Sequence, residues 1–207
     1  MATIDYYFFG ASPFVYLGHK AFEDTAAKHG CGIAYKPVDI AAVFGNSGAK
    51  PLKERPLARQ RYRLLELQRA ADRRGLPINL APRHFPVDAT LADQAVIALL
   101  DEKQDPSAYM FEIFSAVWAR EENISDPAVI TRYLNACGFD GDAILSAAQG
   151  EDVAARRRQN TQEAIAADAV GVPAYVLNGE VFWGQDRIDD LDRALASGRA
   201  PFSAAKS

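Results

Sequence analysis

A serine followed by a proline, Ser12-Pro13, stands at the expected start of a helix. The apolar run 4–9 predicts a strand, and the segment 14–28 carries apolar residues at helical spacing. Serine is favoured at the N-cap and proline at the first helical position. Backbone N–H groups at such a helix end are free and favour an anion, including a thiolate. Ser12 therefore marks a candidate thiolate-binding site, although most serines in this position are only caps.

The hydroxyl of Ser12 suits it to stabilise a thiolate better than to attack a substrate. A serine hydroxyl donates a hydrogen bond to a thiolate, but it is too weak an acid to act as a nucleophile without a base. None of the three histidines, His19, His29 and His84, lies in a recognisable triad motif. Free thiols have a pKa of about 8.5, and each unit by which a helix end lowers that pKa favours the anion by about 1.4 kcal/mol.

The elements that must position Ser12 lie at both ends of the chain. The first is a β-α-β unit with parallel strands, and the second is a hairpin followed by a helix. Between them, after a loop over 45–56, nearly every segment of 57–169 predicts helix. This order indicates an α/β, thioredoxin-like fold, with a discontinuous domain of residues 1–56 and 170–207 split by a large all-helical insertion. The expected elements are strands 4–9, 31–40, 174–177 and 181–183, a first helix over 13–29 and a last helix from about residue 186.

Length and composition are those of an ordinary soluble globular protein: 207 residues, 49% hydrophobic and 24% charged. No run approaches the ~18 apolar residues of a membrane span, and the N-terminus lacks the pattern of a signal peptide, so a cytoplasmic location is expected. The net charge of -4 gives no reason to expect nucleic acid. Cys31 and Cys137 do not form a CxxC pair, which disfavours a disulfide framework, dithiol redox chemistry and a metal site.

Two terminal motifs, YYFFGASPFVYLG and VGVPAYVLNGEVFWGQDR, accompany this order of elements. Together they resemble the 2-hydroxychromene-2-carboxylate isomerases, bacterial relatives of the kappa-class glutathione transferases with a DsbA-like fold. The resemblance covers essentially the whole chain. It implies a glutathione-dependent isomerase, expected to be a homodimer, in which Ser12 faces the glutathione sulfur. The implied substrate is a small aromatic-derived 2-hydroxy or pyruvate-type acid.

The resemblance also implies which residues hold the cysteinyl part of glutathione. Pro173 would be cis, and the backbone N–H and C=O of Val172 would pair with the ligand. The alternative is that Val172-Pro173 only begins a strand. A glutathione-binding asparagine of the loop 44–51 is either kept as Asn46 or lost at Ala49.

The run from Gly184 to Arg187 is implied to bind the γ-glutamyl end of glutathione. Asp186 would bind the ammonium group, and Gln185 would help to hold the carboxylate. Taken by itself, Asp186 predicts only a cap of the last helix. The two roles are compatible, because a carboxylate has two oxygens and several lone pairs.

Candidate substrate contacts are aromatic or basic. Phe14 and Trp183 can approach an apolar pocket from the two terminal motifs, and Arg83 and His84 lie in the connector 77–86, at an expected domain junction where ligand sites tend to occur. A basic segment over 50–74 predicts mainly a solvated helix face, with its residues nearest the loop able to attract carboxylates. An aromatic stripe predicts core before it predicts a pocket, and consists of Tyr109, Phe111, Phe114 and Trp118.

Two other functions stay open at this point. A kappa-like glutathione transferase or peroxidase would use the same thiolate against a halide, an epoxide or a hydroperoxide. A thioredoxin-like scaffold without catalytic cysteines can also bind a peptide or a partner protein without chemistry. Phe9, which stands where many relatives carry an aspartate after the first strand, leaves the substrate open as well.

Overall fold

A four-stranded mixed sheet forms the centre of the computed structural model, which describes residues 2–204. The strand order is β2-β1-β3-β4, with β1 parallel to β2 and antiparallel to β3, and with β3 antiparallel to β4. This is the thioredoxin-like topology predicted from the order of elements. The strands are β1 (Thr3–Phe8), β2 (Gly32–Pro37), β3 (Ala174–Leu177) and β4 (Glu180–Trp183).

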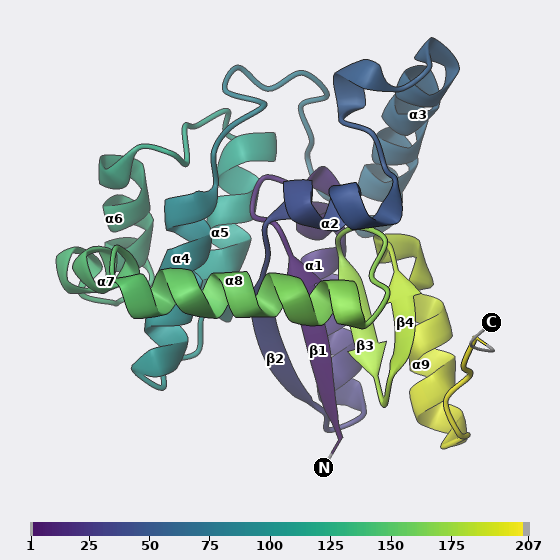
Figure 1. Cartoon of the computed structure of the whole chain (residues 1–207). Coiled ribbons are helices and arrows are strands. Elements are labelled where there is room, and N and C mark those ends of the chain that lie inside the picture. Colours follow the sequence, from purple (N-terminus) through teal and green to yellow (C-terminus); the bar gives the residue numbers. More distant parts are fainter. Residues whose placement is uncertain (1, 205–207) are drawn as a thin grey trace.

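Helices cover both faces of this sheet and form the insertion (Figure 1). The long helix α8 crosses one face, whereas α1 and α9 pack against each other on the opposite face. Helices α3 to α8 all lie between α2 and β3 in the sequence, as the predicted helical insertion requires. The helices are α1 (Pro13–Lys28), α2 (Ile40–Ser47), α3 (Leu57–Arg74), α4 (Thr90–Asp101), α5 (Ser107–Trp118), α6 (Pro127–Ala136), α7 (Gly141–Ala148), α8 (Glu151–Ala166) and α9 (Ile188–Ser197).

One hydrophobic cluster joins the sheet to the inserted helices. The rings of Phe8 on β1 and Phe114 on α5 lie 5.7 Å apart in an edge-to-face arrangement. Tyr109, Phe114 and Trp118 are fully buried, so most of the aromatic stripe of α5 is core, as predicted. Phe111 is half-buried and packs against the edge of this cluster. The insertion therefore shares its core with the thioredoxin-like sheet.

Helix α2 is a correction to the predicted loop and second strand. Strand β2 ends at Pro37 and does not reach residue 40. Asp39 then caps α2, with its side chain accepting from the N–H of Ala41 at 2.9 Å. The helix ends at Gly48, which has a left-handed φ of 71°. Part of the expected loop 45–56 is therefore helical.

Helix α3 exposes most of its apolar residues. Tyr62 and Leu65 are 57% and 49% exposed, whereas Leu67, Ala70 and Ala71 are buried. Helical spacing correctly predicted the helix, but only the second half of its apolar face meets the core. No helix within residues 2–204 is long and apolar enough to cross a membrane.

Candidate functional site

Ser12 lies at the N-terminus of α1, as predicted, and closes a turn after β1. Its N–H donates to the carbonyl of Phe9 at 2.9 Å, and its own carbonyl accepts from Tyr16 at 3.1 Å. The Ser12 hydroxyl oxygen accepts from the N–H of Val15 at 3.4 Å, a long bond for a cap. Because this bond uses only a lone pair, the half-buried hydroxyl keeps its proton to donate.

Two side chains of the inserted helices hold the turn that precedes Ser12. Oδ1 of Asp93, on α4, accepts from the N–H of Gly10 at 2.9 Å. The indole N–H of Trp118, on α5, donates to the carbonyl of Ala11 at 3.3 Å. A Cβ on Gly10 would lie 2.6 Å from the same Asp93 oxygen, so glycine permits this close approach. The insertion thus contributes directly to the position of the Ser12 turn.

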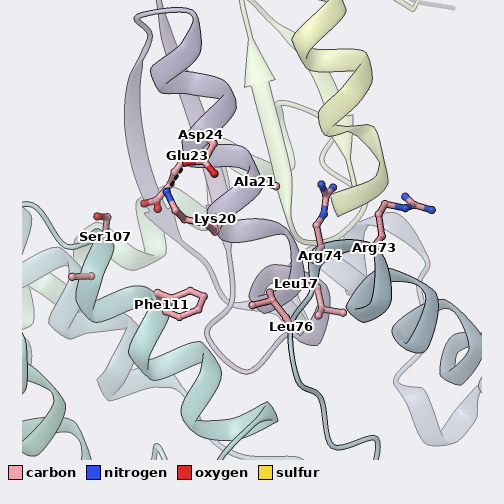
Figure 2. Close-up of a pocket in the computed structure, with 11 residues that line it drawn as sticks. Leu17, Lys20, Ala21, Glu23, Asp24, Arg73, Arg74, Leu76, Ser107 and Phe111 are labelled. Atoms are coloured by element: carbon pink, nitrogen blue, oxygen red, sulfur yellow. Dashed lines mark hydrogen bonds and ion pairs between the residues drawn. The ribbon is translucent and has the colours of Figure 1, made fainter.

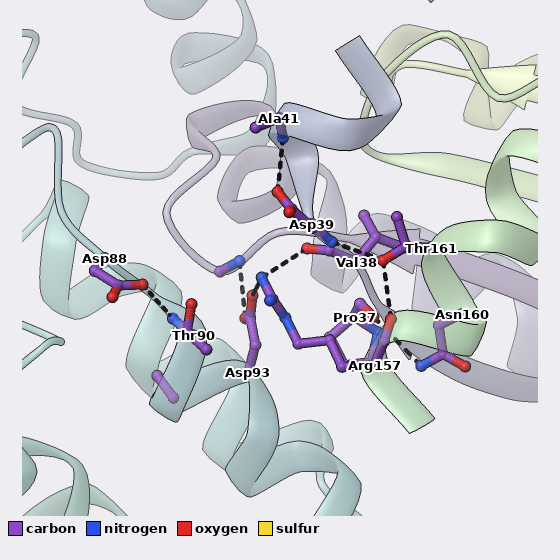
Figure 3. Close-up of polar contacts among 12 residues, drawn as sticks. Pro37, Val38, Asp39, Ala41, Asp88, Thr90, Asp93, Arg157, Asn160 and Thr161 are labelled. Carbon is purple, nitrogen blue, oxygen red and sulfur yellow. Dashed lines mark hydrogen bonds and ion pairs between the residues drawn. The ribbon is translucent and has the colours of Figure 1, made fainter. Parts of the chain in front are cut away.

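Asp93 is a buried acid to which no sequence motif points. Its side chain lies near Arg157 of α8, with 3.9 Å between Oδ2 and Nη2 (Figure 3). Within residues 2–204, Oδ2 of Asp93 has no hydrogen-bond partner, and Arg157 Nη2 donates instead to the carbonyl of Val38 at 3.0 Å. Burial raises the pKa of Asp93 to about 7, although Arg157 and the Gly10 N–H act in the opposite direction. This carboxyl is therefore expected to titrate near neutral pH.

The segment before β3 leads into the strand that pairs with the end of β1, just before the Ser12 turn. The antiparallel register pairs Tyr7 with Ala174, and its continuation places Val172 opposite Phe9. The Val172–Pro173 bond is cis, as predicted. Within residues 2–204, neither the N–H nor the C=O of Val172 makes a hydrogen bond, so both remain available.

Two further contacts fix the surroundings of Val172. The hydroxyl of Ser47, at the end of α2, donates to the carbonyl of Val170 at 3.0 Å. The indole of Trp183 packs so closely on Gly171 that a Cβ there would lie 2.8 Å from its Nε1. Trp183 is nevertheless 51% exposed. Asn46, which precedes Ser47, is exposed in the last turn of α2, at the same end of the helix.

Asp186 does not cap the last helix, contrary to the prediction. It lies in a 3-10 turn over Gln185–Arg187, and α9 begins only at Ile188 without a side-chain cap. The Asp186 carboxylate is 52% exposed and pairs with Arg187 at 2.9 Å. The left-handed φ of 105° at Gly184 lets this turn follow β4 directly.

Gln185 is engaged by the protein itself. It is buried, and its backbone and side-chain oxygens lie 3.1 and 3.4 Å from Nη2 of Arg74. Its Cβ lies so close to α1 that a Cβ on Gly18 would be 2.7 Å away. The predicted contact of Gln185 with a ligand carboxylate therefore gains no support from its placement.

The predicted substrate residues lie in different elements. Phe14 is half-buried in the first turn of α1. Arg83 and His84 are exposed in the connector, where the Arg83 N–H donates to Glu121 at 3.1 Å. The connector reaches the site through Phe85, whose ring lies 4.7 Å from that of Trp118.

A separate groove of about 570 Å³ lies between α1, α3 and α5. Figure 2 shows Arg73 and Arg74 on one side of it and Glu23 and Asp24 on the other. None of the predicted site residues lines it. Within residues 2–204, no group of three or more His, Cys, Asp or Glu side chains is placed to hold a metal ion.

Comparisons with known proteins place this chain next to isomerases and a glutathione transferase. A family model, the DSBA-like thioredoxin domain, matches residues 3–196. The 2-hydroxychromene-2-carboxylate isomerase of Sphingobium xenophagum is 27% identical over 197 residues, which cover 93% of this chain and 97% of the relative. Glutathione S-transferase kappa 1 of Caenorhabditis elegans is 26% identical over 200 residues, or 90% and 88% of the two chains. A solved 2-hydroxychromene-2-carboxylate isomerase matches with a TM-score of 0.81 at 25% identity, over 94% of this chain and 95% of that one.

Proposed function

Because this chain belongs to the DSBA-like thioredoxin domain family, we propose that it binds glutathione at Ser12 and isomerises a small aromatic-derived acid, as its isomerase relatives suggest. The observation that carries the proposal is the free N–H and C=O of Val172, in register with the strand end that leads to Ser12. An extended peptide needs such a pair of backbone groups. Glutathione is a tripeptide thiol, and the N-terminus of α1 at Ser12 favours its thiolate.

The residues of this chain would divide the binding of glutathione among them. Ser12 would donate its hydroxyl proton to the sulfur, aided by the N–H of Phe14, because Pro13 has no N–H and those of Val15 and Tyr16 already donate to Ser12. Val172 would pair with the cysteinyl residue through its backbone. Asp186 would bind the γ-glutamyl ammonium group, and Asn46 would approach from the end of α2.

When bound, glutathione supplies a thiolate that adds to an electrophilic carbon of the substrate, allows bond rotation and leaves unchanged. Ser12 holds the sulfur as the anion before addition and receives it again after expulsion. The chain itself then needs no nucleophile. This agrees with a serine hydroxyl that has no base at hydrogen-bond distance within residues 2–204.

Two assays in series test the proposal. The protein is first passed over immobilised glutathione and eluted with free glutathione. It is then assayed on 2-hydroxychromene-2-carboxylate with and without glutathione. Retention and glutathione-dependent isomerisation are the expected results. Retention with conjugation of 1-chloro-2,4-dinitrobenzene but no isomerisation would favour a kappa-like transferase, for which the Caenorhabditis elegans relative is the supporting observation. Failure to bind glutathione would leave a binding module without this chemistry.

Asp186→Asn is expected to weaken glutathione binding about fivefold and to leave cysteinyl-glycine binding unchanged. The carboxylate is half-exposed and shared with Arg187, so its pairing with the ligand ammonium is worth about 1 kcal/mol. Calorimetric titration of both thiols measures the difference.

Asp190→Asn is the matched control for Asp186→Asn, because Asp190 also pairs with Arg187, at 3.0 Å, from the first turn of α9. It should change neither affinity. Because Asp186 caps no helix, both variants should unfold at the wild-type urea concentration. Equal weakening of both thiols by Asp186→Asn would assign Asp186 to the fold and not to the ligand.

The resemblance also leads us to propose a homodimer. Light scattering after size exclusion would give about twice the 22.6 kDa chain mass if this is correct. A mass equal to one chain would contradict it.

A further inference from the structure

Arg63 is a guanidinium held against aromatic rings close to the Ser12 turn. It lies on α3, with its Cζ 5.9 Å from the ring centre of Phe85 and 5.8 Å from that of Trp118. Such cation–π contacts hold the side chain in place without using its N–H groups. The side chain is half-buried.

Arg63 also has no counter-ion within residues 2–204. No carboxylate there pairs with it, and none of its N–H groups makes a hydrogen bond. Of the other arginines of this helix, Arg69 pairs with Glu66 and Arg74 donates to Gln185. The rest are exposed to solvent, unlike the half-buried Arg63: Arg59, Arg61 and Arg73. A partly desolvated, unpaired cation is unfavourable, so Arg63 stands out as a group that an external anion would satisfy.

A second arginine strengthens the positive charge at this place. Burial and the neighbouring Arg55 both lower the pKa of Arg63, yet a guanidinium stays charged at neutral pH. Arg55 lies over the ring of Phe44, at 5.6 Å, and donates from Nε to the carbonyl of Lys50 at 2.7 Å. The two guanidiniums thus lie close enough for their charges to interact, and neither pairs with a carboxylate within residues 2–204.

The link to Ser12 runs through Trp118. The same indole that lies under Arg63 donates its N–H to the carbonyl of Ala11, the residue before Ser12. Arg63 therefore contacts a residue that holds the turn of the proposed site in place. The groove between α1, α3 and α5 does not include Arg63, Trp118 or Ser12, so the two places are distinct.

We propose that Arg63 binds the carboxylate of an aromatic acid substrate beside Ser12. The guanidinium offers five N–H donors in a planar fork that matches a carboxylate with two parallel hydrogen bonds. Arg55 adds positive potential that favours the same anion. This inference rests on the proposed function and deepens it, because it assigns the receiver of the acid group of the second substrate.

A matched pair of probes tests the assignment without turnover. Calorimetric titration compares 1-naphthoate with 1-naphthamide, which keeps the ring but carries no charge. The wild type should bind 1-naphthoate more tightly. Arg63→Met should weaken 1-naphthoate about tenfold and change 1-naphthamide less than twofold. Arg63→Gln serves the same purpose if the methionine variant fails to fold.

Two arginine variants act as controls. Arg61→Met removes one exposed positive charge from the same helix and should leave both affinities unchanged. Arg73→Met removes a charge from the groove and should also have no effect. Equal weakening by Arg61→Met would reduce the effect to overall charge, and weakening only by Arg73→Met would move the acid to the groove. Either result overturns the assignment.

The remaining outcomes also support or overturn the assignment of Arg63. Unchanged 1-naphthoate binding in Arg63→Met, or no 1-naphthoate binding by the wild type, overturns it. Weaker glutathione binding with unchanged 1-naphthoate binding would assign Arg63 to a glutathione carboxylate and overturns it too. Arg63-dependent 1-naphthoate binding in a protein without glutathione-dependent isomerase activity would support the site and remove only the proposed function.

Discussion

Ser12→Ala is expected to lower glutathione-dependent turnover by up to about 10²-fold, with a loss of less than about 1 kcal/mol in the free energy of unfolding. Removing one charge-assisted hydrogen bond to the thiolate accounts for the kinetic loss. The effect on stability is small because the cap bond from Val15 is long, at 3.4 Å. Steady-state kinetics and urea denaturation of both proteins measure the two quantities.

Asp126→Ala is a matched control for the loss of a helix cap. Asp126 caps α6 with a shorter bond, 2.9 Å from Oδ1 to the N–H of Ala128, and no predicted site residue lies on that helix. This variant should lose about 1 kcal/mol of stability or somewhat more and keep its turnover. If Ser12→Ala keeps full activity on a verified substrate, Ser12 is only a cap. If both variants lose the same activity, the loss reflects stability and not the thiolate.

Features that short sequence signals encode were predictable. Ser12-Pro13 and Asp126-Pro127 both start helices where the cap and the proline require them. Asn178-Gly179 forms the hairpin turn, with Asn178 itself at a positive φ of 52°. In each case the residues that decide the structure are neighbours in the chain. The prediction therefore needed no knowledge of the tertiary fold.

Features set by distant partners were not predictable from the sequence. Asp93 lies in a largely apolar helix, and only the fold brings it to Gly10, 83 residues earlier. An acid in a largely apolar helix is a sequence signal that could have pointed to Asp93. Helix α2 was not predicted because Gly45 and the C-cap Gly48 resemble a loop. Its start depends on the cap Asp39.

The surroundings of two side chains near the site were not predictable, for the same physical reason. Arg63 could not be distinguished from the other basic residues of 50–74 in the sequence. What sets it apart is its contact with Phe85 and Trp118, which come from elsewhere in the chain. Gln185 is implied to help hold a ligand carboxylate, and only the fold shows that it is buried against Gly18. A motif fixes residue types, whereas exposure depends on what packs against them.

The free energy of unfolding of the wild type is expected to fall as the pH rises from about 4 to 7, and Asp93→Asn should abolish the part of this fall that comes from Asp93. In the folded protein burial raises the pKa of Asp93 to about 7, whereas an unfolded aspartate titrates near pH 3.9. Between these values the folded state binds more protons, so the free energy of unfolding falls with rising pH. The difference is at most about 4 kcal/mol, since each pKa unit corresponds to about 1.4 kcal/mol. Asparagine can still accept from Gly10 but does not titrate.

The charges around Asp93 define the control. Arg157 faces it from α8, Tyr109 from α5, and Asp88 from the segment just before α4. Hydrogen bonds from Thr90 lower the pKa of Asp88, so its ionised form stabilises the fold and this contribution disappears as the pH falls. In urea denaturation, the stability of Asp93→Asn relative to wild type should therefore rise with pH. That of Asp88→Asn should stay nearly constant above about pH 4, because the pKa of Asp88 is lowered below its ordinary value. Parallel curves for Asp93→Asn and the wild type would show that Asp93 is ionised in the folded protein well below pH 7, with Arg157 outweighing its burial.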